Sequence, residues 1–173
     1  NLGNIYYYGL SVEQDYKKAR EYYELAIKQN NSAAMNSLGN IFYNGQGIEQ
    51  DFIFAKYFYE SAAKLNNSDA LNNLGNAYSE GKGVNQNFSE AKKNYELAAQ
   101  QNNPNALYNL GNLYFYGIGV EKSLAKAIKY FELAAKESHP YALNNLGILY
   151  LQGEGVIKNL DKAKEYFESA SKQ

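Results

Sequence analysis

The sequence predicts an all-α protein built from about five copies of one helix-turn-helix unit. Three observations carry this prediction: a Leu-Gly pair recurs every 36 residues, a glycine-rich turn follows it, and alanines recur at fixed offsets after the turn. The Leu-Gly pairs stand at 2–3, 38–39, 74–75, 110–111 and 146–147. A period of roughly 20–50 residues means that one supersecondary unit stacks on copies of itself. We therefore expect function on the surface that the copies build together.

The register divides the chain into a single repeat array. The repeats comprise residues 1–31, which form a partial first repeat, and then 32–67, 68–103, 104–139 and 140–173. Two short antiparallel helices cannot bury both apolar stripes alone, so neighbouring repeats must stack. Because neither end carries a polar capping helix, we expect the array to be a segment of a longer one.

The first helix of each repeat, helix A, is predicted from hydrophobic spacing. In the second repeat, Ala34, Leu38 and Ile41 fall at helical intervals and predict a helix from Ser32 to about Asn44. The following Gly45-Gln46-Gly47 supplies residues that tolerate a positive φ, so the helix should end there.

The second helix, helix B, is predicted after Asp51 from a second amphipathic run. Side chains able to cap a helix precede every helix B: Asp15, Asp51, Asn87, Ser123 and Asn159. The residues expected before helix A are Asn31, Asn67, Asn103 and His139. Pro104 and Pro140 then fit the first helical position, where no hydrogen-bond donor is lost.

The composition excludes several classes of partner. The formal net charge is -1 and Arg20 is the single arginine, so the chain lacks the positive field and the guanidinium groups that phosphate recognition uses. We therefore expect no nucleic-acid partner. No apolar run approaches the roughly 20 residues of a membrane span, so neither membrane insertion nor a leader is expected. The absence of cysteine fits either redox setting and leaves the localisation unknown.

Catalysis has little support in the sequence. His139 is the only histidine and stands at a predicted helix cap, with no cysteine and no repeated carboxylate pair around it. Acidic residues such as Glu21 and Glu24 lie among lysines on helix B, as on a solvated helix face. We expect no catalytic residue, no metal site and no cofactor.

The pattern Ala34, Leu38-Gly39, Phe42, Gly45-Gln46-Gly47-Ile48, which recurs from Ala106 to Val120, resembles the Sel1-like repeat, a family similar to the tetratricopeptide repeat. The resemblance implies a right-handed α-α superhelix, or solenoid, whose A helices line a concave groove. Relatives use this groove as protein-interaction adaptors in secretion quality control, the cell envelope and signalling, so an envelope, secreted or secretory-pathway location is compatible with it. The departures are few: Ser11 replaces a turn glycine, Asn94 replaces an aromatic residue, and Asn31 and Asn67 replace the glycine expected after helix B.

The groove-facing positions follow from the register around the Leu-Gly pair. Three parallel rows result, mostly of carboxamides. After the pair come Asn4, Asn40, Asn76 and Asn112, with Ile148 breaking the row. Before Leu come Asn1, Ser37, Asn73, Asn109 and Asn145, and one residue earlier Asn36, Asn72, Tyr108 and Asn144. Each carboxamide offers two donors and an acceptor, which can bind the main chain of an extended peptide irrespective of its sequence.

Aromatic anchors are expected on the same face. They are Tyr7, Tyr8, Tyr43, Phe115 and Tyr116, with Tyr108 and Tyr141 further up. The rows contain no cation, so a neutral or mixed segment is a more suitable partner than an acidic C-terminal peptide. An alternative interpretation stays open: the asparagines can bond only to neighbouring repeats and brace the stack.

The leading hypothesis is a protein-interaction scaffold, or adaptor, that binds an extended peptide or protein segment in the groove. The alternative is a structural array, because equal repeats with apolar ends can join head to tail into a filament or oligomer. An enzyme is not expected.

Overall fold

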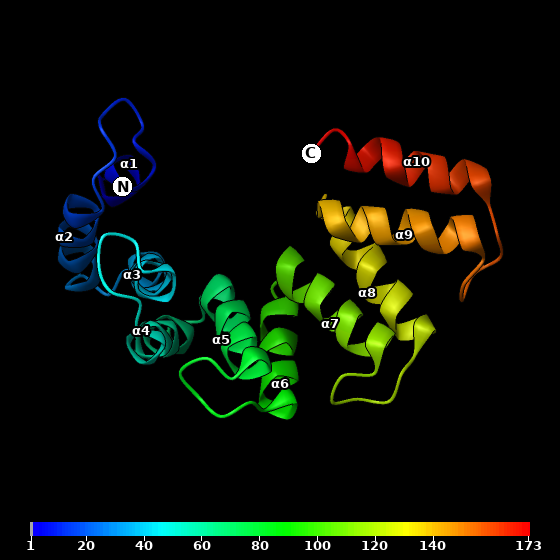
Figure 1. Cartoon of the computed structure of the whole chain (residues 1–173), viewed down its shortest axis with the longest axis horizontal. Coiled ribbons are helices and arrows are strands. Elements are labelled where there is room, and N and C mark those ends of the chain that lie inside the picture. Colours follow the sequence, from blue (N-terminus) through cyan, green and yellow to red (C-terminus); the bar gives the residue numbers. More distant parts are fainter. Residues whose placement is uncertain (1) are drawn as a thin grey trace. The chain divides into compact units, whose positions relative to one another are not determined.

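In a computed structural model, which describes residues 2–173, the chain consists of helices joined by short turns (Figure 1). Ten helices and no strand occur in these residues, which confirms the prediction of an all-α repeat fold. The A helices are α1 (Leu2–Tyr8), α3 (Ser32–Asn44), α5 (Ser68–Glu80), α7 (Pro104–Tyr116) and α9 (Pro140–Gln152). The B helices are α2 (Tyr16–Ile27), α4 (Phe52–Lys64), α6 (Phe88–Ala99), α8 (Leu124–Lys136) and α10 (Leu160–Ala170).

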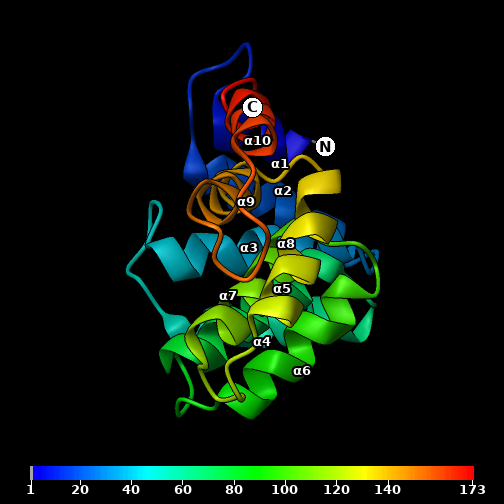
Figure 2. The same ribbon diagram turned by 90° about the vertical axis from the view of Figure 1, so that its right-hand side faces the viewer.

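The helices form two compact units. Unit 1 ends at Asn87 and contains α1 to α5, and unit 2 runs from Phe88 to Gln173 and contains α6 to α10. Within each unit every helix packs on the next one along the chain. The pair α9 and α10 illustrates this arrangement, since the two helices lie side by side in both views (Figure 2).

Local capping explains why the helices begin where they do. Ahead of α3, Asn31 Oδ1 accepts the backbone N–H of Ala34 at 2.9 Å. Ahead of α9, His139 Nδ1 accepts the N–H of Ala142 at 3.2 Å. The other side chains that cap helices in this way are Asp15, Asp51, Asn67, Asn103, Ser123 and Asn159. The predicted starts of these helices are therefore confirmed.

The turns depend on residues with a positive φ. Gly45, Gly81, Gly117 and Gly153 end their A helices with φ between 67° and 77°. Ser11, which replaces the second turn glycine of the first repeat, also takes a positive φ, 63°. The expectation that Asn31 and Asn67 replace a glycine after helix B is wrong by one residue. The left-handed residues are Asn30 and Asn66, and the residues after them are the helix caps.

The Leu-Gly pair holds helix A against helix B of the same repeat. Leu38 is buried, and a methyl group built on Gly39 would lie 2.6 Å from Tyr59 Cε1 of α4. The same ring-on-glycine contact joins Gly147 to Phe167. In four of the five repeats a second ring pair stacks, such as Tyr6 on Tyr22 with centroids 5.5 Å apart. The third repeat has Asn94 in place of the second ring. These contacts place the glycine and the aromatic columns in the packing roles that the spacing predicted.

Candidate functional site

Each unit has an A-helix face, which consists of the side chains that its A helices do not bury in the core. Most residues of the predicted site are exposed or half-buried on these faces. The exposed ones are Asn4, Tyr8, Tyr116, Tyr141 and Asn144. The half-buried ones are Asn36, Asn40, Tyr43, Asn73, Asn76, Tyr108, Asn109, Asn112 and Phe115.

One described residue of the rows stands apart from this surface. Asn72 is only 6% exposed, so its side chain belongs to the packed interior, and its expected place on a binding surface is corrected. A row defined by register alone cannot foresee which member its neighbours cover. Asn1 lies outside the described residues.

In unit 1 the row after the Leu-Gly pair is bonded inward. Tyr23 Oη donates to Asn4 Oδ1 at 2.9 Å, and Tyr59 Oη donates to Asn40 Oδ1 at 2.8 Å. In both cases the tyrosine is the ring that packs on the glycine of the same repeat. Burial raises the pKa of Tyr23 to about 12, so its hydroxyl stays protonated and able to donate. These asparagines therefore brace helix A onto helix B.

The second row connects neighbouring repeats. Asn73 Nδ2 of α5 donates to Asn36 Oδ1 of α3 at 2.9 Å and to Asn40 Oδ1 at 3.2 Å. One amide group thus connects all three rows and two repeats. These bonds between repeats are of the kind that the bracing interpretation expects.

Near the C-terminal ends of the A helices of unit 1, tyrosine hydroxyls bond to the next repeat. Tyr7 Oη donates to Gln46 Oε1 at 2.6 Å. One repeat later, Tyr43 Oη donates to Glu80 Oε2 at 2.7 Å, and Lys82 Nζ donates to Tyr43 Oη at 3.0 Å. Each bond joins an A helix to the end of the next A helix or its turn.

Lys82 is a cation beside this face that the rows did not contain, because it lies in the turn after α5. Its ammonium pairs with Glu80 at 2.7 Å and lies 5.0 Å from the centroid of the Tyr43 ring. Burial alone would raise the pKa of Glu80, but hydrogen bonds from Lys82 and Tyr43 outweigh it and lower that pKa. The charge of Lys82 is therefore neutralised within the chain.

Helices α7 and α8 of unit 2 have phenyl rings at two positions where unit 1 has tyrosine hydroxyls. Phe115 stands at the position of Tyr7 and Tyr43, and Phe131 at the position of Tyr23 and Tyr59. A phenyl ring cannot donate a hydrogen bond. Within residues 2–173, the carboxamide of Asn112 has no hydrogen-bonding partner, unlike that of Asn40.

A pocket of about 190 Å³ opens between α7 and α9 of unit 2. It is lined by Phe115, Tyr116, Phe131, Asn145, Ile148, Leu149, Gln152 and Glu154. Phe131 and Leu149 are buried, whereas Tyr116 and Gln152 are exposed. This α7–α9 pocket has apolar walls and a polar rim.

Sequence reasoning found only part of this pocket. Phe115 and Tyr116 were predicted as anchors, but Gln152 and Glu154 were missed because they follow the rows rather than belong to them. A comparison of equivalent positions in the repeats could have indicated the pocket. Phenylalanine stands at 115 and 131 where the first two repeats have tyrosine, and Ile148 stands where the other repeats have asparagine. The other two predicted anchors, Tyr108 and Tyr141, differ in how much of the ring is available to a partner. Tyr108 stacks on His139 with centroids 4.6 Å apart, whereas Tyr141 is 67% exposed.

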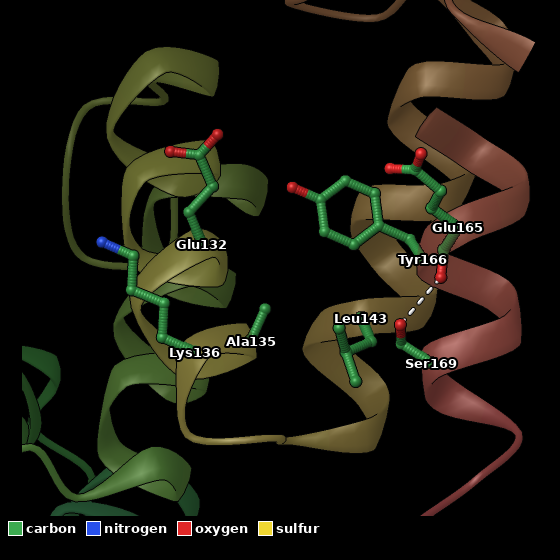
Figure 3. A pocket seen from close by; sticks show the side chains of 7 residues that line it. All are labelled: Glu132, Ala135, Lys136, Leu143, Glu165, Tyr166 and Ser169. Atoms are coloured by element: carbon green, nitrogen blue, oxygen red, sulfur yellow. Dashed lines mark hydrogen bonds between the residues drawn. The ribbon is translucent and has the colours of Figure 1, made fainter. Parts of the chain in front are cut away.

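A second, wider pocket of about 430 Å³ lies on helices α8, α9 and α10 (Figure 3). Tyr166 extends from α10 toward α8, where Glu132 lies (Figure 3). Its pKa is raised, chiefly by burial and further by Tyr150, Glu132 and Glu165. Ser169 Oγ donates to the backbone oxygen of Glu165 at 2.8 Å, so its proton is engaged in its own helix. Nothing in this lining pairs a nucleophile with a base.

Residues 2–173 contain no cluster of three or more His, Cys, Asp or Glu residues suited to a metal ion. Among the same residues, every helix is too short or too polar to cross a membrane.

Solved structures with the same fold are known. A Sel1 repeat protein from Oxalobacter formigenes is 29% identical, with a TM-score of 0.91 over 99% of this chain and 70% of its own. The protective antigen c5321 of uropathogenic Escherichia coli is 30% identical, with a TM-score of 0.85 over 99% of this chain and 37% of its own. Helicobacter pylori cysteine rich protein B is 30% identical, with a TM-score of 0.58 over 78% of this chain and 96% of its own.

The comparison with curated proteins gives no significant match. The Sel1 repeat family model matches residues 1–31, 32–67, 68–103, 104–139 and 140–173. The repeats it matches and the structures that resemble the chain agree on one general kind of fold, a scaffold for protein interactions. The chain therefore belongs to the Sel1 repeat family.

Proposed function

We propose that the chain is an interaction scaffold that binds an extended segment of a partner protein along the A-helix face of unit 2, through α7 and α9. The observation that carries the proposal is the difference between the units. In unit 1, carboxamides such as Asn40 and Asn73 bond to other side chains of the chain itself. Within the described residues of unit 2, Asn112, Asn144 and Asn145 keep their carboxamides without a partner in the chain.

Carboxamides without partners suit recognition of a main chain. Each can donate to a carbonyl and accept from an N–H of an extended peptide, and a peptide that satisfies them forms bonds that unit 1 makes internally. The exposed rings of Tyr116 and Tyr141 lie on the same two helices and provide anchors of the type that interfaces favour. The proposal contains no catalytic step, because neither pocket brings a nucleophile to a base.

The test uses displayed random peptides of about 12 residues selected for binding to the whole chain. We expect enriched peptides whose affinity falls by about tenfold or more when Asn112, Asn144 and Asn145 are all replaced by alanine. The matched control replaces Lys129 and Lys164, exposed on the B helices, and should leave affinity unchanged. Thermal unfolding verifies that both variants fold. Failure to enrich any peptide, or equal affinity of the asparagine variant, would overturn the proposal.

Self-association is the second candidate, and one surface favours it. Helix α4 turns outward Ile53, Phe54 and Tyr57, which are 72%, 53% and 60% exposed. The first repeat has Lys17, Lys18 and Glu21 at these positions. Contiguous exposed apolar side chains of this kind often mark contact surfaces. Because they lie on one helix side, they favour two copies of the chain side by side rather than head to tail.

Sedimentation at increasing concentration tests this second candidate. We expect a dimer that dissociates when α4 receives the first repeat's residues through Ile53→Lys, Phe54→Lys and Tyr57→Glu. Ile53 and Tyr57 are mostly exposed, but Phe54 also stacks on Phe42 with centroids 5.3 Å apart, so the variant should unfold at a slightly lower temperature than the parent chain and still fold. A monomer at every concentration would rule out self-association through α4.

A further inference from the structure

We infer that the α7–α9 pocket receives a lysine or arginine side chain of the bound segment. The inference rests on the proposed function and deepens it, since it assigns a side-chain preference to a face that otherwise recognises main chain. It is carried by the size of the pocket, its charge and a comparison with the same position in unit 1.

The size and walls of the pocket suit one long side chain. Its volume of about 190 Å³ lies below the roughly 300–1,000 Å³ of small-molecule sites. Phe115, Ile148 and Leu149 form apolar walls above the buried ring of Phe131. Lysine and arginine bury their methylene stems against such walls while the charged head stays in polar surroundings.

The rim of the pocket suits a positive head group. Glu154 is the single charged residue among those that line it, and the carboxamide oxygens of Asn145 and Gln152 can accept hydrogen bonds. The exposed ring of Tyr116 adds a surface that attracts cations. One cation of the chain lies nearby: Lys122 Nζ is 5.7 Å from the Phe115 centroid but does not line the pocket.

Unit 1 contains an internal precedent for an ammonium at this place. Two repeats before Glu154, Lys82 stands at the same repeat position. Its Nζ donates to Tyr43 Oη, pairs with Glu80, and lies 5.4 Å from the centroid of the Phe52 ring. The residues of unit 2 at the positions of Tyr43, Glu80 and Lys82 are Phe115, Gln152 and Glu154. The chain's own ammonium is therefore replaced by a carboxylate. A cation from a partner would restore the balance of charge.

An NMR titration of the whole 173-residue chain tests the inference with three small probes. They are the N-acetyl, N'-methylamide derivatives of lysine, arginine and norleucine, the last being an uncharged analogue of the lysine stem. We expect lysine and arginine to shift the backbone amides of Ile148, Gln152 and Glu154, and norleucine to shift them far less. Glu154→Gln should weaken lysine binding about fivefold. The control Glu121→Gln, in the exposed turn after α7, should not.

A second variant closes the pocket without truncating a side chain. Phe115→Tyr introduces the hydroxyl that Tyr7 uses to bond Gln46, the residue equivalent to Glu154. We expect this hydroxyl to engage Glu154 and abolish the shifts caused by lysine, while thermal unfolding verifies the fold. Equal shifts from lysine and norleucine, or no effect of Glu154→Gln, would overturn the inference.

The two proposals fail in different ways. If selected peptides lose affinity in the asparagine variant but not in Glu154→Gln, main-chain binding stands and the cation pocket is wrong. If capped lysine binds through Glu154 while peptides ignore the asparagines, the pocket stands and the extended-segment proposal is wrong.

Discussion

A single hydroxyl distinguishes repeats that brace themselves from repeats that leave polar groups available. Where the ring on the glycine is tyrosine, as in Tyr59, its hydroxyl bonds to the asparagine after the Leu-Gly pair. Where the ring is Phe131, the corresponding Asn112 lacks that bond. The asparagine row could be predicted from the 36-residue spacing. The direction in which each carboxamide bonds could not, because it depends on a residue 19 positions further on.

Removal of this bond should cost stability in unit 1 and little in unit 2. Tyr59→Phe should lower the free energy of unfolding by about 0.5–1.5 kcal/mol. Asn40→Ala leaves the buried hydroxyl of Tyr59 unpaired, also removes one of the two bonds that Asn73 donates, and should cost about 1–3 kcal/mol. Denaturant unfolding of both single variants and the double variant measures the coupling, expected at about 1 kcal/mol. Asn112→Ala is the matched control and should be nearly neutral; additive effects of the unit 1 pair would contradict the bond.

The glycine of the Leu-Gly pair should resist even a methyl group. In an ordinary helix, glycine to alanine is favourable by about 0.5–1 kcal/mol. In Gly39→Ala the added carbon would lie 2.6 Å from Tyr59 Cε1, and overpacking of this kind costs about 1–3 kcal/mol. We therefore expect net destabilisation in denaturant unfolding. Asn44→Ala, exposed on the same helix, should change little; a stabilised Gly39→Ala would show that the helices are not in close contact.

At the scale of the helix, boundaries were predictable because their causes are local. Caps, turn glycines and the prolines at the first helical position act within a few residues, so α3 begins and ends where its sequence indicates. Lys82 and Glu154 were not predictable as parts of the face, since they lie in turns whose tertiary partners belong to the preceding repeat. The left-handed residue after α2 was likewise expected at Asn31 but is Asn30. Its position becomes visible only from the backbone φ, which composition does not encode.

The cap of α9 should make stability depend on pH. His139 is buried, its Nδ1 accepts the N–H of Ala142, and burial lowers its pKa from 6.5. Between the lowered folded pKa and the ordinary unfolded one, the unfolded chain binds more protons. The contribution of His139 is therefore fully present above the unfolded pKa and is lost as pH falls through the folded value.

Chemical unfolding between about pH 7.5 and about pH 5.5 measures this loss. We expect the free energy of unfolding to decrease toward the lower pH. His139→Asn keeps a cap of the type that Asn103 provides one repeat earlier and removes the titrating group, so its stability should depend less on pH. If the free energy of unfolding changed equally with pH in the parent chain and the variant, the pKa of His139 would be the same in the folded and the unfolded chain, which would contradict the prediction.

At the scale of the molecule, five repeats of one length do not make five equivalent surfaces. The repeat period predicted the fold and the family, because stacking depends on residues present in every copy. The α7–α9 pocket depends on Phe115, Phe131 and Ile148, which differ from the residues at the same positions in the first two repeats. The surface that we propose for the partner is therefore marked by departures from the repeat rather than by the repeat itself.

Chemical-shift mapping of a selected peptide on the whole chain measures this claim most directly. Tight peptides should perturb backbone amides of α7 and α9, strongest around Asn112, Tyr116, Asn144 and Ile148. Amides on the outward sides of α8 and α10 should remain in place. Shifts confined to α8 and α10, or spread equally over every A helix of unit 1, would contradict the account.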